Sequence, residues 1–309
     1  MLKELLALSL ILTSGFACAQ SSKAPELPAI ENPTPIDPAR VSLDQSAALI
    51  QSGIPESFVR ELEKRYTRKK KWFQDALKLV EPNVFGFMYQ GDYLKHDSAG
   101  ARKKTSRYLL AHQNSFKAAE KRYQVSSESI AALLWVETKL GKSLGNHPIP
   151  FVFYSIALSG QPSVCQEMQK LTEGKLAKSK TPEKPDLQTA QKKLQERCKQ
   201  KSEWAIEELK VLARLEESKK LDVFGLRGSF AGAFGLAQFL PSSYEKYAVS
   251  DYRKRPDLFL ISDAILSIGN FLKQNGWKAD STESQTLALY AYNRSRDYGQ
   301  VILKIAEAL

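Results

Sequence analysis

The sequence predicts an all-α, mainly helical fold, and two observations support that class. Apolar side chains recur at helical spacing over most of the chain, for example at Phe58, Leu62 and Tyr66. No stretch of useful length alternates apolar and polar residues as a half-buried strand does. With 309 residues, of which 43% are hydrophobic, the chain can bury a sizeable core in one or two domains.

The N-terminus has the layout of a secretory signal peptide. Lys3 precedes an apolar run over residues 5–16, and the small-residue segment Ala17-Cys18-Ala19 follows it. The run is too short to span a bilayer, and a buried N-terminal helix is the alternative. We therefore expect residues 1–19 to be removed on export to the periplasm, where nucleic acid is not a natural partner.

Cys18 leaves two forms of the exported protein open. The small-x-small pattern fits cleavage after Ala19, whereas an outer-membrane lipoprotein would be cut before Cys18 and acylated there. Gly15 stands where a lipoprotein signal usually has a Leu-like residue, which favours the soluble form; a membrane partner is expected only if Cys18 is lipidated. Cys165 and Cys198 then form an even pair in an oxidising compartment, and we predict a disulfide between them, with two free thiols as the alternative.

Prolines and helical patterns divide the rest of the chain. Residues 20–40 contain five prolines and are expected to form an extended tether. Residues 41–309 form the body and show no internal repeat. Helices are expected there near residues 58–66, 73–80, 103–123, 203–221, 257–275, 283–292 and 297–308. Residues 163–201 are rich in Lys, Gln and Glu, and are interpreted as a solvated helical insertion held by the Cys165–Cys198 bridge.

The charge of the chain favours an anionic partner, because the formal net charge is +11. The basic run at residues 68–71 is interpreted as a solvated helix face that could also help to hold an acidic glycan. The three histidines, His96, His112 and His147, are scattered and lack zinc-site spacing. The sequence therefore calls for no metal and no cofactor.

Glu137 is the candidate acid. It lies in a helix expected over residues 127–140, where Ile130, Leu133 and Leu134 mark an apolar stripe whose i+7 position is Glu137. A carboxyl group among apolar residues has a raised pKa and can donate a proton near neutral pH. The alternative is a glutamate at the edge of the stripe that pairs with a surface lysine.

Two further segments carry polar groups suited to a ligand. Residues 228–238 hold three glycines among small residues, which permits close backbone approach. No Gly-Lys-Ser/Thr follows them and no strand precedes them, so a phosphate-binding Walker loop is excluded. In the segment at residues 291–295, Tyr292 and Asn293 supply donors and acceptors, although a buried tyrosine at a helix end is the simpler reading.

Together the three segments resemble the lytic transglycosylases, whose motifs read Glu-Ser/Thr, Gly-Leu-x-Gln and Ala-Tyr-Asn in this order. Here they stand at residues 137–138, 235–238 and 291–293. Among these enzymes the chain is most similar to the membrane-bound lytic murein transglycosylase B family, over roughly residues 45–309. That closer resemblance rests on residues 136–141, 228–233 and 238–244 and on the spacing Tyr292-Asn293-x4-Tyr298.

The resemblance implies a lysozyme-like fold with a glycan-binding cleft, and it implies residue roles. Glu137 would protonate the glycosidic oxygen between MurNAc and GlcNAc and then act as base. Ser229 and Gln238 would hydrogen-bond the sugar near the scissile bond. Tyr292, Asn293 and Tyr298 would orient Glu137 and the muramic acid residue.

The resemblance also implies a reaction that uses one carboxylate, whereas most glycosidases use two. The acetamido oxygen of the substrate would support the oxocarbenium-like centre, and the C6 hydroxyl would attack to give a 1,6-anhydromuramic end. The matched motifs offer no second acid before Asp297, in agreement with this scheme. A muramidase that uses water, or a non-catalytic peptidoglycan-binding protein, is the alternative.

Two departures from the family pattern carry expectations. Some members have a calcium loop after the Ser-Ser-Tyr stretch, but residues 249–256 are basic here and lack the spacing of such a loop, so no calcium site is expected. The insertion at residues 163–201 could cover or extend the cleft. It could also be a docking surface for other cell-wall enzymes.

Overall fold

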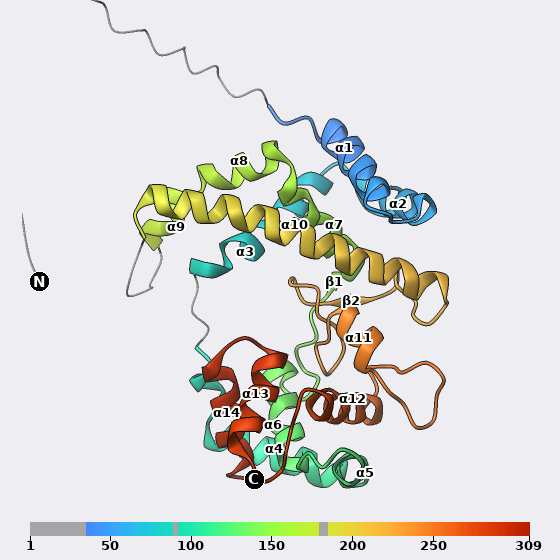
Figure 1. The fold of residues 1–309 in the computed structure, drawn as a ribbon, viewed down its shortest axis with the longest axis vertical. Coiled ribbons are helices and arrows are strands. Elements are labelled where there is room, and N and C mark those ends of the chain that lie inside the picture. The colour runs from blue at the N-terminus through green and yellow to red at the C-terminus, as the bar shows by residue number, and fades with distance from the viewer. Residues whose placement is uncertain (1–34, 89–91, 179–184) are drawn as a thin grey trace, which may run out of the picture. The chain divides into compact units, whose positions relative to one another are not determined.

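The structure is a computed structural model that describes residues 35–88, 92–178 and 185–309 (Figure 1). The expected all-α fold is confirmed, because helices make up nearly all regular structure in these residues. The predicted signal peptide and most of the predicted tether lie outside the described residues. Within them, no helix is both long and apolar enough to cross a bilayer.

The first half of the chain is a series of short helices. They are α1 (Pro38–Gln51), α2 (Glu56–Leu62), the π-helix η1 (Glu63–Thr67), α3 (Trp72–Val84), the 3-10 helices η2 (Phe85–Met88) and η3 (Leu94–His96), α4 (Ala99–Ala111), α5 (Gln113–Tyr123) and α6 (Ser127–Thr138). The expected single helix over residues 103–123 is wrong, because the backbone leaves the helical conformation at His112 and divides it into α4 and α5.

The second half contains a long helix between shorter elements. They are β1 (His147–Pro148), α7 (Ile149–Ala157), the 3-10 helix η4 (Leu158–Gly160), α8 (Pro162–Lys170), α9 (Thr172–Lys178), α10 (Leu187–Glu217), β2 (Arg227–Gly228), α11 (Pro241–Tyr247), α12 (Ile261–Gln274), α13 (Thr282–Tyr292) and α14 (Arg296–Ala306). The two strands pair antiparallel, with His147 opposite Gly228.

Two boundaries differ from the expected ones for local chemical reasons. The tether was expected to run to residue 40, but α1 begins at Pro38. Proline fits the first helical position, which needs no N–H donor, and the Asp37 side chain caps the helix by accepting from Ala39 N. The basic run at residues 68–71 is exposed as expected, but it lies in the turn between η1 and α3 and not on a helix face.

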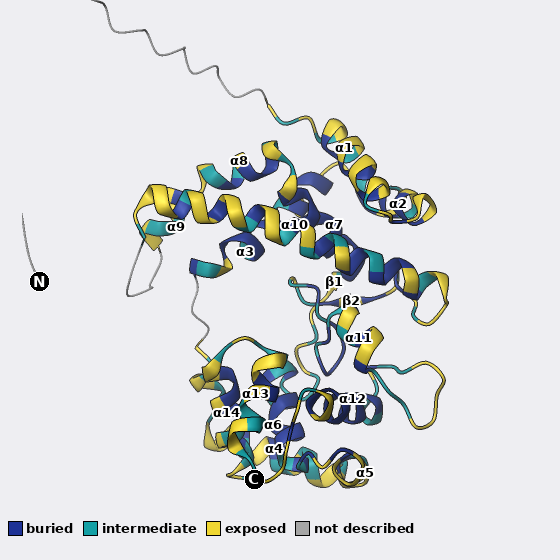
Figure 2. Cartoon of the chain, viewed as in Figure 1, coloured by how far each residue is buried: buried dark blue, intermediate teal, exposed yellow. Residues whose placement is uncertain are grey.

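Helix α6 is buried nearly all round. It packs against α4, α5, α12 and α14, and the ribbon coloured by burial shows it largely dark (Figures 1 and 2). The predicted apolar stripe is confirmed, since Ile130, Leu133 and Leu134 are fully buried, but residues on the other sides of α6 are buried as well. Glu137 is one of the few positions of α6 that keep partial exposure.

Helix α10 forms a second packing centre. It lies against α7, α3 and η4, and all nine residues of α7 are buried beneath these neighbours (Figure 1). Helix was expected to resume only near Glu203, but α10 begins at Leu187 after the side-chain cap Asp186. Its early turns bury Ala190, Leu194 and Cys198 at four-residue spacing.

The described parts of the predicted insertion, residues 163–178 and 185–201, are thus largely helical, as predicted, but they are not simply a solvated excursion. Val164, Cys165 and Met168 of α8 are also buried, so α8 and α10 both contribute to the core. The predicted disulfide is present and joins Cys165 of α8 to Cys198 of α10, with the two Cα atoms 6.0 Å apart. The crosslink closes a loop in which the two residues are 33 positions apart.

Replacing both cysteines with alanine is expected to lower the free energy of unfolding by about 3 to 4 kcal/mol, because the unfolded chain regains the entropy of the open loop. Urea denaturation of the oxidised protein and of the Cys165→Ala/Cys198→Ala variant measures the difference. The oxidised protein after full reduction serves as the control and should approach the variant. Equal stability of all three samples would contradict the expected role of the bridge.

Candidate active site

Glu137 lies in the last turn of α6, where the chain turns back sharply. Lys139 and Leu140 both adopt left-handed conformations, with φ of 53° and 61°, and Gly141 follows with φ of 90°. The amide of Leu140 donates to Leu134 O at 3.2 Å and closes the end of the helix. The backbone thus turns away directly after Glu137, whose side chain lies at the C-terminal end of the helix.

Tyr298 provides the direct hydrogen bond to this carboxyl group. Its hydroxyl donates to Glu137 Oε1 at 2.5 Å, and the Tyr298 residue is only 1% exposed. The ring is fixed by its place in the first turn of α14, where the Ser295 hydroxyl caps the helix by accepting from Tyr298 N. Since α14 packs against α6, the two residues are held together by helix packing.

The surroundings raise the pKa of Glu137 to about 7. Burial of the carboxyl group is the largest cause, and the hydrogen bond from Tyr298 and the charge of Lys139 oppose it. The position adds to this effect, because the C-terminal end of a helix carries partial negative charge and disfavours an anion. A carboxyl group with this pKa holds and releases its proton near neutral pH, as a general acid must.

Tyr292 and Asn293 support the Glu137–Tyr298 pair from one side. The Tyr292 hydroxyl donates to Ala237 O, and its ring stacks on that of Tyr298 with the centroids 6.4 Å apart. The Asn293 amide donates to the Tyr93 hydroxyl at 3.2 Å, and the Tyr93 ring stands edge-on to Tyr298 at 5.6 Å. In the structure, Tyr292 and Asn293 therefore act on Tyr298 and its neighbours, whereas Tyr298 itself contacts the acid.

Ser229 and Gln238 lie in a compact turn of the glycine-rich segment. The Ser229 hydroxyl accepts from Ala233 N at 3.1 Å, and the Ser229 amide donates to Ala233 O at 2.7 Å. Gln238 has a left-handed backbone, with φ of 48°, and its side-chain amide donates to Gly235 O at 2.8 Å and to Leu144 O at 3.3 Å. Both side chains are partly exposed and are held in place by backbone atoms.

The loop after α6 joins this turn to Glu137. The buried Thr138 hydroxyl contacts Leu236 O at 3.3 Å and accepts from Gly141 N at 3.0 Å. Gly145 approaches the turn so closely that a Cβ there would lie 2.2 Å from Gly228 O, and its φ of 79° also favours glycine. The motifs at residues 137–138 and 228–238 are thus brought together by backbone contacts that larger side chains would prevent.

The sequence reasoning missed a group of cationic and aromatic residues beside Glu137. The Trp135 indole donates to His96 O at 2.9 Å, and the Lys139 ammonium lies 4.6 Å from the centre of the Trp135 ring and contacts His96 Nδ1. Burial lowers the pKa of both Lys139 and His96. Lys139 stands within the motif at residues 136–141, so the sequence carried a signal for it. For Tyr93 and His96 the sequence carried no signal, because only tertiary contacts bring Tyr93 to Tyr298 and His96 to Trp135.

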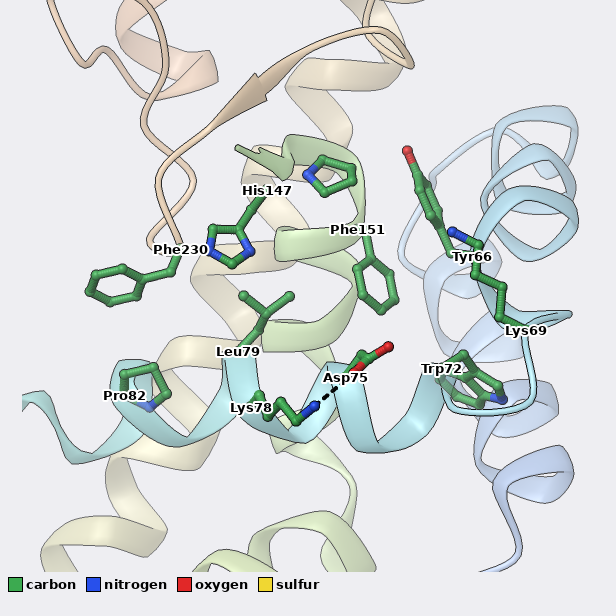
Figure 3. A pocket seen from close by; sticks show the side chains of 11 residues that line it. Tyr66, Lys69, Trp72, Asp75, Lys78, Leu79, Pro82, His147, Phe151 and Phe230 are labelled. Atoms are coloured by element: carbon green, nitrogen blue, oxygen red, sulfur yellow. Dashed lines mark hydrogen bonds and ion pairs between the residues drawn. The ribbon is translucent and has the colours of Figure 1, made fainter. Parts of the chain in front are cut away.

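A pocket of about 470 Å³ is lined in part by Phe230, the residue that follows Ser229 in the chain (Figure 3). It is largely aromatic and apolar, with a few polar groups, as ligand pockets commonly are. Its lining consists of Tyr66, Lys69, Trp72, Asp75, Lys78, Leu79, Pro82, His147, Pro148, Phe151 and Phe230. Asn83 holds the Phe230 backbone against α3 by donating to Phe230 O at 3.1 Å.

The described residues offer no group of three or more His, Cys, Asp or Glu side chains placed to hold a metal ion. The basic segment at residues 249–256, where no calcium site was expected, is an exposed loop. The absence of a metal requirement stays a prediction from the sequence.

Comparison with known proteins supports the family expected from the motifs. A region of the chain is 39% identical over 79 residues to membrane-bound lytic murein transglycosylase B of Escherichia coli (strain K12); that match spans 25% of this chain and 22% of the relative. Over 87% of the chain, the fold is similar to that of the E. coli lytic transglycosylase Slt35 solved in complex with bulgecin A, with a TM-score of 0.60, 16% identity and 92% of that chain covered.

Two Pseudomonas aeruginosa structures are similar to a comparable degree. Soluble lytic transglycosylase SltB1 has a TM-score of 0.60 at 18% identity, over 87% of this chain and 97% of that one. SltB3, solved in complex with NAG-anhNAM-pentapeptide, has a TM-score of 0.59 at 15% identity, over 87% of this chain and 78% of that one. Identities this low establish the fold alone.

The family is established by the sequence itself. Residues 41–289 match the Transglycosylase SLT domain, and this match includes the motifs around Glu137 and Gln238. The resemblance stated from the motifs is therefore confirmed: the chain belongs to the Transglycosylase SLT domain family.

Proposed function

We propose that this chain is a peptidoglycan lytic transglycosylase in which Glu137 acts first as acid and then as base. The single observation that carries the proposal is the Glu137 carboxyl group, which has a pKa raised to about 7 and a hydroxyl donor 2.5 Å away. Family membership and the complexes that neighbours are described as forming with bulgecin A and with NAG-anhNAM-pentapeptide support a glycan substrate.

The proposed reaction needs one protein carboxyl group. Protonated Glu137 donates to the glycosidic oxygen as the bond from that oxygen to C1 of MurNAc breaks, which releases GlcNAc with a free hydroxyl. The acetamido oxygen of the substrate stabilises the positive charge at C1. The Glu137 carboxylate then takes the proton of the MurNAc C6 hydroxyl as O6 bonds to C1, which gives the 1,6-anhydro product and restores the acid.

The residues around Glu137 have different roles in this scheme. The Tyr298 hydroxyl stabilises the carboxylate that exists between the two proton transfers, and Tyr292 and Asn293 hold Tyr298 in place. Ser229 and Gln238 hydrogen-bond the sugar next to the scissile bond. Both side chains are partly exposed, and their turn is connected to Glu137 through contacts with the loop at residues 139–146. The aromatic pocket beyond Phe230 extends the surface available to the substrate.

The proposed location is the periplasm, with peptidoglycan as partner. It rests on the signal-peptide layout of residues 1–19 and on the position of the substrate outside the cytoplasmic membrane. The disulfide between Cys165 and Cys198 agrees with an oxidising compartment.

The product distinguishes the transglycosylase from a muramidase. Mass spectrometry of digested sacculi is expected to show muropeptides that end in 1,6-anhydromuramic acid, lighter by one water than hydrolysed products, because no water enters the proposed reaction. A digest that contains only reducing-end muramic acid would assign the chain to the muramidase alternative.

Replacing Glu137 with glutamine is expected to reduce the rate of sacculus lysis by about 10²- to 10⁴-fold, because an amide cannot donate and recover the proton. The decrease in turbidity of a sacculus suspension measures the rate. Glu128→Gln is the matched control, since Glu128 lies in the first turn of the same helix and should leave the rate near that of the unmodified protein. Equal lysis by both variants would favour the non-catalytic alternative.

Replacing Tyr298 with phenylalanine is expected to move the alkaline limb of the activity profile to higher pH by about one unit. The hydrogen bond from Tyr298 lowers the pKa of Glu137, so its loss raises that pKa above about 7 and keeps the acid protonated at higher pH. The pH dependence of kcat measures this shift, even if kcat itself falls. Tyr93→Phe is the control, because the Tyr93 hydroxyl bonds to Asn293 and not to the acid; a limb that stays in place or moves down in Tyr298→Phe contradicts the assignment.

A further inference from the structure

A second concave site lies away from Glu137, between α11 and the loop that follows it. This cavity of about 330 Å³ is rich in cationic side chains. Its lining consists of Arg122, Leu215, Lys220, Tyr244, Glu245, Ala248, Val249, Ser250, Arg253, Lys254, Arg255 and Pro256. The proposed reaction uses none of these residues, so it does not account for the cationic side chains that line this cavity.

The charge of the cavity is strongly unbalanced. Five of the lining side chains are cationic and one, Glu245, is anionic. Glu245 is already paired with Arg214 at 2.8 Å, and Arg122 is paired with Asp251. In the described part of the chain, no carboxylate forms an ion pair with Lys220 or with the cations at residues 253–255. Like charges gathered in a cleft concentrate a positive potential there, which an anionic ligand would relieve.

The loop that brings these cations together is anchored by a buried carboxylate. Asp263, which is 1% exposed, accepts from the Ser250 hydroxyl and from Asp257 N, each at 2.9 Å. These two bonds fix both ends of the basic segment. At its start the Val249 amide also donates to the Ser267 hydroxyl at 3.0 Å, and beyond its end Leu258 O accepts from Leu236 N at 2.8 Å.

We propose that this cavity binds a phosphate group, as a phosphate ion or as the phosphate ester of an envelope lipid headgroup. Arg253 and Arg255 offer planar guanidinium groups that can each donate two parallel hydrogen bonds to phosphate oxygens, and Lys220 and Lys254 add compact positive charges. A phosphate carries three or more acceptor oxygens and so can use several of these donors at once. The inference does not depend on the proposed reaction, since it shares no residue with it.

The proposed site would place the enzyme near anionic lipid. A pocket for headgroup phosphate would give the protein a reversible attachment to the membrane surface. Tyr252, which is 84% exposed beside the three cations, is the type of residue that lies at the headgroup level of a membrane. Polybasic segments add binding energy to anionic membranes in the same way.

The test compares two variants of the protein that lose the same charge. Arg253→Ala/Lys254→Ala/Arg255→Ala removes the pocket cations, and Arg68→Ala/Lys70→Ala/Lys71→Ala removes three exposed cations from the turn before α3. Inorganic phosphate is titrated into each and followed by calorimetry and by NMR of the backbone amides. We expect the unmodified protein and the control variant to bind phosphate saturably. We expect the pocket variant to bind phosphate at least about tenfold more weakly.

The second arm of the test identifies the source of the phosphate. Each protein is mixed with vesicles of phosphatidylcholine alone or with added phosphatidylglycerol and sedimented. Loss of sedimentation with the anionic vesicles in the pocket variant alone points to lipid headgroups, whereas phosphate binding without sedimentation points to soluble phosphate. No saturable phosphate binding by the unmodified protein, or equal losses in both variants, overturns the proposal. Lysis of sacculi is measured separately and is expected to be unchanged by the pocket variant.

Discussion

The hydrogen bond between Tyr298 and Glu137 is the interaction on which the rest of the site depends. It joins two residues that are 161 positions apart in the chain. The two groups meet because α14 packs on α6, while Tyr292 and Tyr93 pack against the Tyr298 ring. The packing of α14 on α6 therefore holds the Tyr298 hydroxyl within hydrogen-bonding distance of the Glu137 carboxyl group.

Opposing electrostatic effects set the state of the acid. A glutamate enclosed by apolar neighbours would stay protonated well into the alkaline range, whereas one fully exposed to water would be ionised at neutral pH. Here burial and the helix end favour the neutral form, and the Tyr298 hydroxyl and the Lys139 charge favour the anion. The balance lies near neutrality, which suits the proposed reaction, in which the group gives up and recovers one proton in each turnover.

The sequence predicted the fold class and the family, because helical periodicity and short motifs are local properties. The sequence also predicted the candidate site residues, which are Glu137, Ser229, Gln238, Tyr292, Asn293 and Tyr298. The contacts described above connect the segments that carry them. Their roles stay predictions. It identified the apolar stripe of α6 but not the burial of the other sides of that helix, which depends on the helices that surround it. It also placed the start of α10 too late, because Ala190, Leu194 and Cys198 are buried by tertiary packing of a segment whose composition is polar. Tyr93 and His96 could not be found from the sequence, because only tertiary contacts with Tyr298 and Trp135 bring them to the site.

The anchoring of the basic loop by Asp263 has a consequence for how this protein can change over evolutionary time. Both ends of the segment are fixed by one carboxylate inside the fold, and Leu258 then continues the frame that supports the Gly235–Gln238 turn. Residues 251–255, between the two anchored ends, are exposed, so substitutions there are expected to leave that frame in place. A change in what this loop binds can therefore arise without any change in the surroundings of Glu137.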